Sequence, residues 1–214
     1  MTACTTTRRS GASVVLVTLA VAFAFGAIDQ YLQVAIPWSH PGAREFAVQV
    51  SNGMSALWLL VPFLAGAWQG SQRRAVLVGL AATWLSVLAY VLMIVSPMEG
   101  AQLTPRTLAF SLASQWPWFA GGLTAGPLYG WLGHRWRTGR SLAAALLAAL
   151  PILLEPAARW LVAGLGLANV PWLPFHWPTG GGAMAAEFAE FAIGMLLTLM
   201  AIKLVRRHRA ALTA

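Results

Sequence analysis

Charged side chains are scarce in this sequence. Only 9% of its 214 residues are charged, whereas 58% are hydrophobic. So few charged groups cannot cover the water-facing surface of a soluble domain, and most of the surface must therefore lie in an apolar environment. The composition excludes an ordinary soluble globule and predicts that the lipid bilayer is the main partner of the chain.

Cysteine and acidic residues are also rare. The single cysteine, Cys4, excludes an internal disulfide, and six acidic residues stand against 14 lysines and arginines, for a net charge of +8. A basic protein can bind nucleic acid, but such proteins gather their basic residues on one folded face. Here the arginines form small clusters between apolar runs, which is the pattern that orients membrane proteins. We expect no nucleic-acid binding.

Long apolar runs make up most of the chain. Each has about 20 residues, the length of an α-helix that crosses about 30 Å of hydrocarbon, and the runs lack the alternation of a transmembrane β-strand. The first run continues to Ile36, too long for a cleaved signal peptide. The sequence predicts an all-α, polytopic transmembrane helical bundle of about six spans, at residues 13–36, 48–69, 75–95, 107–133, 141–167 and 183–204.

The basic residues predict the orientation of this bundle. Eleven of the 14 lysines and arginines fall on one side of the expected spans, and basic loops stay in the cytoplasm. Both ends are therefore expected inside, with residues 1–12 as an N-terminal tail, residues 13–204 as the transmembrane domain and residues 205–214 as a basic C-terminal tail. The preference for Arg over Lys and the many alanines fit a high-GC bacterium, so we expect a multi-pass protein of a bacterial plasma membrane.

Several ionisable residues fall at membrane depth, where a charge is costly and usually functional. Asp29 and Glu155 lie in the outer parts of their expected spans, and Glu187 and Glu190, three residues apart, share one helix face. We interpret Asp29, Glu155 and Glu190 as parts of an outward-facing polar cavity, whereas Glu187, and alternatively Asp29, would be solvated at the headgroups. The candidate ligand-binding residues are Asp29, Gln33, Asn52, Gln115, Trp116, Glu155, Arg159 and Glu190, with Tyr90 and Trp116 as stacking surfaces.

Glu155 also has a purely structural interpretation. Arg159 follows it by four residues, the favourable order for an ion pair on one helix, and such a pair lowers the cost of burying either charge. Pro156 removes a backbone hydrogen bond and predicts a kink beside them.

Small residues form two helix faces. Gly122, Gly126 and Gly130 recur at four-residue spacing, which favours close packing against another helix of the bundle. Alanines at 143–145 and 148–149 make a second such face. Either face is alternatively a docking surface for a membrane partner protein.

Catalytic and metal-binding patterns are missing from the sequence. It contains no HExxH helix, no GxSxG turn and no Walker-type glycine loop. His40 and His176, on unrelated loops, are weak evidence for a metal. We expect no enzymatic activity, no catalytic residues, no cofactor and no metal.

Four short motifs carry a resemblance to a known family. They are GAIDQYLQ at 26–33, SNGMS at 51–55, GGLTAGPLYG at 121–130 and LLE at 153–155. With them the chain resembles a family of small actinobacterial multi-pass membrane proteins, a domain of unknown function, which implies no activity. In architecture alone it is similar to the solute-binding subunits of energy-coupling-factor transporters.

Two functional hypotheses follow from these patterns. The first is the binding or transport of a small-molecule ligand through the polar cavity, with Asp29, Glu155 and Glu190 in polar recognition or proton coupling. The second is a non-catalytic membrane scaffold or partner subunit that docks through the small-residue faces, and an intramembrane enzyme comes third.

Overall fold

The chain folds entirely into helices in the part that the computed structural model describes. This part comprises residues 11–35, 39–53, 55–100, 102–139, 141–165 and 180–213, with the side chains of 52, 53, 55, 99, 207–209 and 211–213 left out. The main helices are α1 (Gly11–Ala35), α2 (Pro41–Val48), α3 (Leu60–Ala67), α4 (Gln72–Ile94), α5 (Pro105–Ser114), α6 (Trp116–Gly139), α7 (Leu142–Gly164) and α8 (Gly181–Thr213). Three short helical turns join them: η1 (Gln49–Gly53), η2 (Ser55–Leu59) and η3 (Pro97–Glu99). The predicted all-α class is confirmed.

Four helices of the described residues, α1, α4, α7 and α8, are long and apolar enough to cross a membrane. A fifth span results if the segment from α2 to α3, which bends by 46°, counts as one crossing. The protein is thus a multi-pass membrane protein with four or five candidate spans rather than six. Large apolar side chains are exposed along α1, α7 and α8, where lipid would cover them.

The expected span at 107–133 is divided in two. Helix α5 ends at Ser114, Gln115 stands outside both helices, and α6 begins at Trp116. Pro117 has no N–H to continue the hydrogen bonds of α5, which accounts for the break. Helix α6 is also not among the candidate spans, and glycines together with the polar and basic residues of its last turns occupy much of it.

The expected span at 48–69 is broken as well. Helix α2 begins at Pro41, which suits a first helical turn. The chain then passes through the π-helical turn η1 and the 3₁₀ turn η2 before α3 starts at Leu60. Such irregular backbone is stable at membrane depth only where it is buried in protein or lines a cavity.

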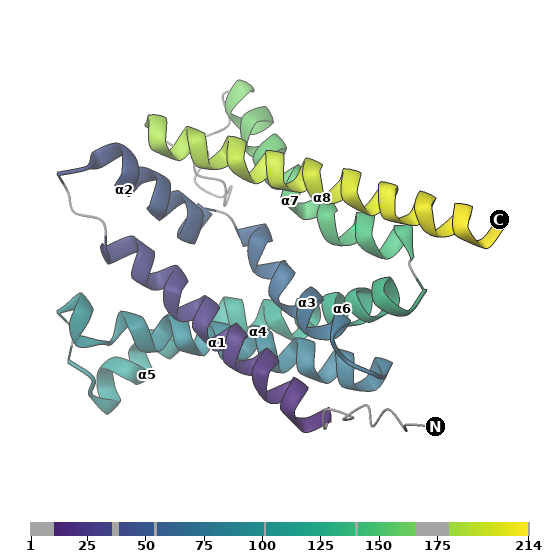
Figure 1. The fold of residues 1–214 in the computed structure, drawn as a ribbon. Helices are drawn as coiled ribbons and strands as arrows, with labels where there is room; N and C mark the ends of the chain where they lie inside the picture. The colour runs from purple at the N-terminus through teal and green to yellow at the C-terminus, as the bar shows by residue number, and fades with distance from the viewer. Residues whose placement is uncertain are drawn as a thin grey trace, which may run out of the picture.

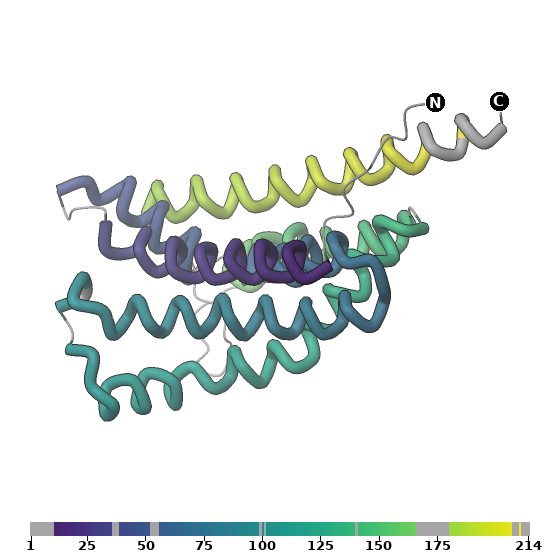
Figure 2. The backbone as a smooth tube through the Cα atoms, turned by 60° about the horizontal axis from the view of Figure 1, so that its bottom comes forward, coloured from purple at the N-terminus to yellow at the C-terminus, as the bar shows by residue number. Residues whose placement is uncertain are grey.

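The helices pack around α4, which contacts α1, α3 and α6, while α8 contacts α7 and α2. Figure 2 shows α4 between α1 and α6, with α8 on the opposite side of the bundle from α5. Three glycines permit the close approach of α6 to α3 and α4. A Cβ atom added at Gly66 would lie 2.0 Å from the carbonyl oxygen of Gly130. One added at Gly130 would lie 2.3 Å from the carbonyl oxygen of Ala75, and one added at Gly133 would lie 1.9 Å from that of Phe63. Helix α6 can therefore contact the backbones of α3 and α4 only without side chains at these positions.

Several helix ends lie together at one end of the bundle. The start of α1, the turn from α3 to α4, the start of α7 and the end of α8 are at the same end of the bundle in both views (Figures 1 and 2). Most of the lysines and arginines are close to these points. The structure does not show which side of a membrane this end faces, so the cytoplasmic assignment stays a prediction.

Candidate functional site

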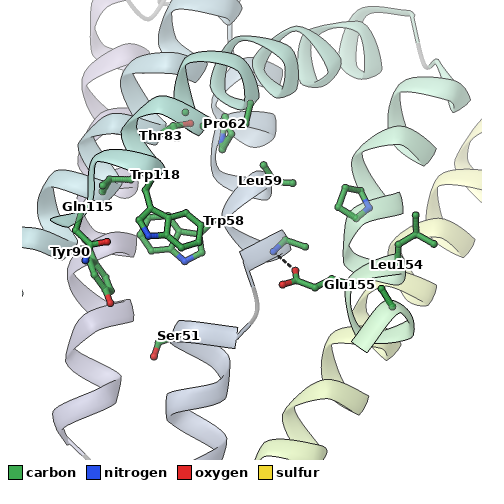
Figure 3. Close-up of a pocket in the computed structure, with 17 residues that line it drawn as sticks. Ser51, Trp58, Leu59, Pro62, Thr83, Tyr90, Gln115, Trp118, Leu154 and Glu155 are labelled. Atoms are coloured by element: carbon green, nitrogen blue, oxygen red, sulfur yellow. Dashed lines mark hydrogen bonds between the residues drawn. The ribbon is translucent and has the colours of Figure 1, made fainter. Parts of the chain in front are cut away.

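A cavity of about 660 Å³ lies where the broken α2 to α3 segment faces α4, α6 and α7. Most of its wall is apolar or aromatic. Figure 3 shows Tyr90 and Gln115 on one side and Glu155 with Leu154 on the other. The polar side chains of the wall come from four segments and are Ser51, Thr83, Tyr90, Gln115 and Glu155.

The break in the bent segment forms part of this wall. Helical turns leave their first N–H groups without partners of their own, and these need acceptors from elsewhere. Glu155 of α7 supplies one, because its Oε2 atom accepts a hydrogen bond of 2.6 Å from the Ala56 N–H (Figure 3). A carboxylate from another helix therefore caps the second half of the broken segment.

Glycines bring α8 close to both of its neighbours. A Cβ atom at Gly182 would lie 1.9 Å from the Gly42 carbonyl oxygen of α2. At Gly194 it would lie 3.0 Å from the side chain of Leu153 on α7. The face of α8 that carries Glu187 and Glu190 is thereby held against α2, η1 and α7.

Behind Glu155 lies a buried cluster of four charged side chains, which we call the Arg159 cluster. It consists of Arg159 and Glu155 on α7 and Glu187 and Glu190 on α8. Arg159 pairs with Glu155 through Nη2 and with Glu187 through Nη1, while Glu190 Oε2 lies 3.9 Å from Nη1. Gln49 of η1 donates a hydrogen bond of 2.5 Å to Glu187 Oε1. Both glutamates of α8 are 0% exposed.

The Arg159 cluster joins α7 to α8 and places several ionisable groups inside the protein. Burial of ionised groups costs several kcal/mol for each, and the cost is offset only where partners and hydrogen bonds surround them. Glu155 connects the two features of the site, since it lines the cavity and also pairs with Arg159. The charge of the cluster is therefore felt at the cavity wall.

A second polar network reaches the cavity from α1. Gln33 Nε2 donates to Gln30 Oε1 at 2.8 Å and to the Tyr90 hydroxyl at 3.2 Å. Trp58 makes edge contacts with Tyr90 and with Phe25, with ring centroids 5.9 Å and 5.3 Å apart. These contacts hold the aromatic side of the cavity in one arrangement.

Comparison with known proteins identifies the family of the chain. Residues 5–214 match the family described as "Family of unknown function (DUF6518)". The chain belongs to this family. No curated protein and no solved structure matches the chain. The expected resemblance to a domain of unknown function is confirmed, whereas an actinobacterial source stays an expectation, and any activity has to be argued from the site.

Three of the sequence-predicted site residues, Glu155, Arg159 and Glu190, come together in the Arg159 cluster. Two of the predicted residues, Glu155 and Gln115, line the cavity. Gln33 reaches the wall through Tyr90, a residue expected as a stacking surface.

Three other predicted residues are placed differently. Asp29 is buried, with its Oδ2 atom lacking a hydrogen-bond partner among the described residues, and it lies off the cavity wall. Trp116 is 65% exposed and lies off the wall, which Trp118 lines instead. The reason is helical geometry, because residues two apart point about 200° away from each other. The side chain of Asn52 lies outside the described part of the chain.

Sequence reasoning did not single out three contributors to the site, Gln49, Trp58 and Glu187. The spacing of Glu187 and Glu190 indicated a shared face, but the choice of α7 as the partner of that face depends on helix packing. Gln49 and Trp58 belong to the broken segment, whose path the apolar pattern does not reveal.

Proposed function

We propose that this family member binds a small solute in the cavity, as a binding or transport protein without catalytic activity. The observation that carries the proposal is the cavity itself, about 660 Å³ in volume and bounded by a buried carboxylate. Cavities that bind small molecules commonly measure about 300 to 1,000 Å³ and have apolar walls with a few polar groups.

The broken segment supports the same function. Transporters often bind their solutes where a membrane helix is interrupted, because the free backbone groups there face a cavity. Here Ser51 of η1 and Ala56 and Trp58 of η2 line the cavity at the break. The chain thus has an irregular turn in an apolar segment, where a continuous helix would satisfy the backbone hydrogen bonds more easily in lipid.

The composition of the wall indicates the class of solute. Trp58, Tyr90 and Trp118 offer flat apolar surfaces, which favour an aromatic or otherwise planar body. Glu155 presents an acceptor, and Gln115 both donates and accepts. We infer an amphipathic molecule with a planar apolar part and a hydrogen-bond donor or a positive charge that points to Glu155.

The scaffold alternative receives less support. Gly122, Gly126 and Gly130 of α6 all face side chains or backbone of α4. The alanine face of α7 is covered as well, with Ala144 and Ala148 packed beside Tyr129 and Leu132 of α6. The faces that a partner protein would need are therefore occupied inside the chain.

A cavity-filling substitution tests the proposal. A side chain at Gly121 meets no atom within 4 Å and the residue lines the cavity, so Gly121→Phe should fill the space without a clash. We expect small molecules that co-purify with the wild type, extracted and measured by mass spectrometry, to fall at least about tenfold in this variant, the equivalent of about 1.4 kcal/mol.

The matched control is Gly139→Phe. Gly139 belongs to the same helix and also has open space around it, but it lies away from the cavity. Equal recovery of the same molecules from all three proteins, or recovery of none from the wild type in native lipid, would contradict solute binding in this cavity.

A further inference from the structure

The Arg159 cluster contains more acid than base. Its three carboxyl groups face one guanidinium group, and Arg159 is the cation in each of the three ion pairs. If all four groups were ionised, the cluster would carry a net charge of −2 in a buried place. An excess of two charges at this depth is far more costly than a neutral carboxyl group.

Among the described residues, the ion pairs and hydrogen bonds seen at the cluster involve Arg159 as their one cation. From η1 comes Gln49, a neutral amide that donates to Glu187. From η2 comes the Ala56 N–H, which donates to Glu155. Helix α2 also packs on α8 and carries Arg44 and Glu45, of which Glu45 accepts a hydrogen bond of 3.2 Å from the Gly182 N–H, more than one helical turn before Glu187.

Glu190 is the member of the cluster whose carboxylate form would lack hydrogen bonds from the described residues to stabilise its charge. Its side chain is 0% exposed, and neither of its carboxyl oxygens has a hydrogen-bond partner within the described part of the chain. By contrast, Glu187 Oε1 meets both Arg159 and Gln49, and Glu155 meets both Arg159 and the Ala56 N–H. A neutral carboxyl group avoids the cost of a buried charge, and its O–H can donate to a carboxylate of the same cluster.

A metal ion fits this place less well than a proton. No group of three His, Cys, Asp or Glu side chains in the described ranges is arranged to hold a metal. Na⁺ and divalent cations need several oxygens at once, whereas a proton needs a single carboxyl oxygen.

We propose that the Arg159 cluster is a proton-binding site and that Glu190 is the group that takes up the proton. Uptake converts the Glu190 carboxylate into a neutral carboxyl group, and release restores a carboxylate 3.9 Å from Arg159 Nη1, the nearest cation of the cluster. Because Arg159 also holds Glu155 on the cavity wall, loading and release of the proton change the electrostatic field in the cavity. The proton site does not depend on the proposed solute.

Infrared spectroscopy of the full chain in lipid vesicles tests the site directly. At neutral pH the wild type should show the C=O stretching band of a buried neutral carboxyl group, shifted when H₂O is exchanged for D₂O. Glu190→Gln should remove that band. Glu45→Gln serves as the control and should leave the band in place. Asp29→Asn separates any contribution of Asp29, whose Oδ2 atom is also buried without a partner among the described residues.

Stability provides a second measurement that separates protonation from a structural role. Glutamine has the shape and hydrogen-bonding capacity of a neutral glutamic acid, so Glu190→Gln should keep the wild-type melting temperature at neutral pH. Glu187→Gln removes a charge that Arg159 pairs with, and it should lower the melting temperature. A carboxyl band that Asp29→Asn leaves unchanged and that persists in Glu190→Gln, or a melting temperature that falls as far in Glu190→Gln as in Glu187→Gln, would overturn the proposal, whatever the result with the cavity variants.

Discussion

At the scale of single residues, Arg159 determines whether the interior of the bundle is stable. Its guanidinium group pairs with Glu155 on its own helix and with Glu187 on α8, and the residue is only 7% exposed. Removal of one partner from a buried ion pair leaves an uncompensated charge, which is much more harmful than the loss of a surface pair.

Arg159→Gln should therefore lower the free energy of unfolding by about 3 to 5 kcal/mol at neutral pH. The deficit arises because Glu155 and Glu187 lose the cation that they share. Chemical unfolding in detergent at neutral pH measures it. Arg106→Gln, in the exposed first turn of α5, is the control and should change stability little. An Arg159→Gln variant as stable as Arg106→Gln would show that the bundle does not depend on this cation.

The residue scale also shows what the sequence can reveal about the site. The spacing of Glu155 and Arg159 indicated an ion pair, and that pair is present. Glu187 could not be recognised as the second partner of Arg159, because this contact depends on how α8 docks against α7. Trp116 was predicted to line the site instead of Trp118. The choice between them depends on where α6 starts and how it is rotated, and neither can be known without the break at Gln115.

At the scale of elements, the glycines of α6 set the distances between three helices. Gly130 is the central one, because it lies against Ala75 and Gly79 of α4 and against Gly66 of α3. The nearest atoms are backbone atoms, which cannot rotate away from an added methyl group as a side chain can. Even the smallest side chain at this position requires the helices to separate.

Gly130→Ala should accordingly destabilise the protein by about 1 to 3 kcal/mol. Gly121→Ala lies in the same helix and meets no atom within 4 Å, so it should be neutral or stabilising by up to about 1 kcal/mol. Thermal unfolding of both variants in the same detergent measures the difference. Equal melting temperatures would mean that α6 can move away from α4 without loss.

The elements also show where apolar length predicts helices and where it does not. Helices α1, α4 and α7 coincide with expected spans to within about three residues at either end. The prediction works for them because, in lipid, a continuous apolar run can form its backbone hydrogen bonds only as a helix. The spans expected at 48–69 and 107–133 are interrupted. Hydrophobicity does not detect a π-helical turn or a missing N–H at Pro117, since neither changes the apolarity of the run.

At the scale of the whole molecule, the start of α1 and the end of α8 lie at the same end of the bundle (Figure 1), and most of the arginines are near these points in the sequence. An even number of crossings is needed for this arrangement. Four crossings, by α1, α4, α7 and α8, meet this condition, whereas a fifth crossing by the bent segment would place the two ends on opposite sides. The basic residues favour the cytoplasm for the shared end.

Cysteine labelling tests the predicted orientation. Cys4 is the single cysteine of the sequence, so no other thiol interferes. A membrane-impermeant maleimide should leave it unmodified in intact cells and modify it after permeabilisation. The variant Cys4→Ala with Gly100→Cys, at the opposite end of α4, should be labelled in intact cells. The reverse pattern would invert the orientation and place the cytoplasm at the other end.

Helix α8 is longer than any crossing requires. Its 33 residues extend about 50 Å, some 20 Å more than the hydrocarbon of a bilayer. The surplus turns, around Lys203 and Arg206, must stand among phosphate groups or in water. The end of α8 thus forms a positively charged extension of the helix that holds Glu187 and Glu190. Any tilt of this extension at the headgroups therefore also moves these two glutamates.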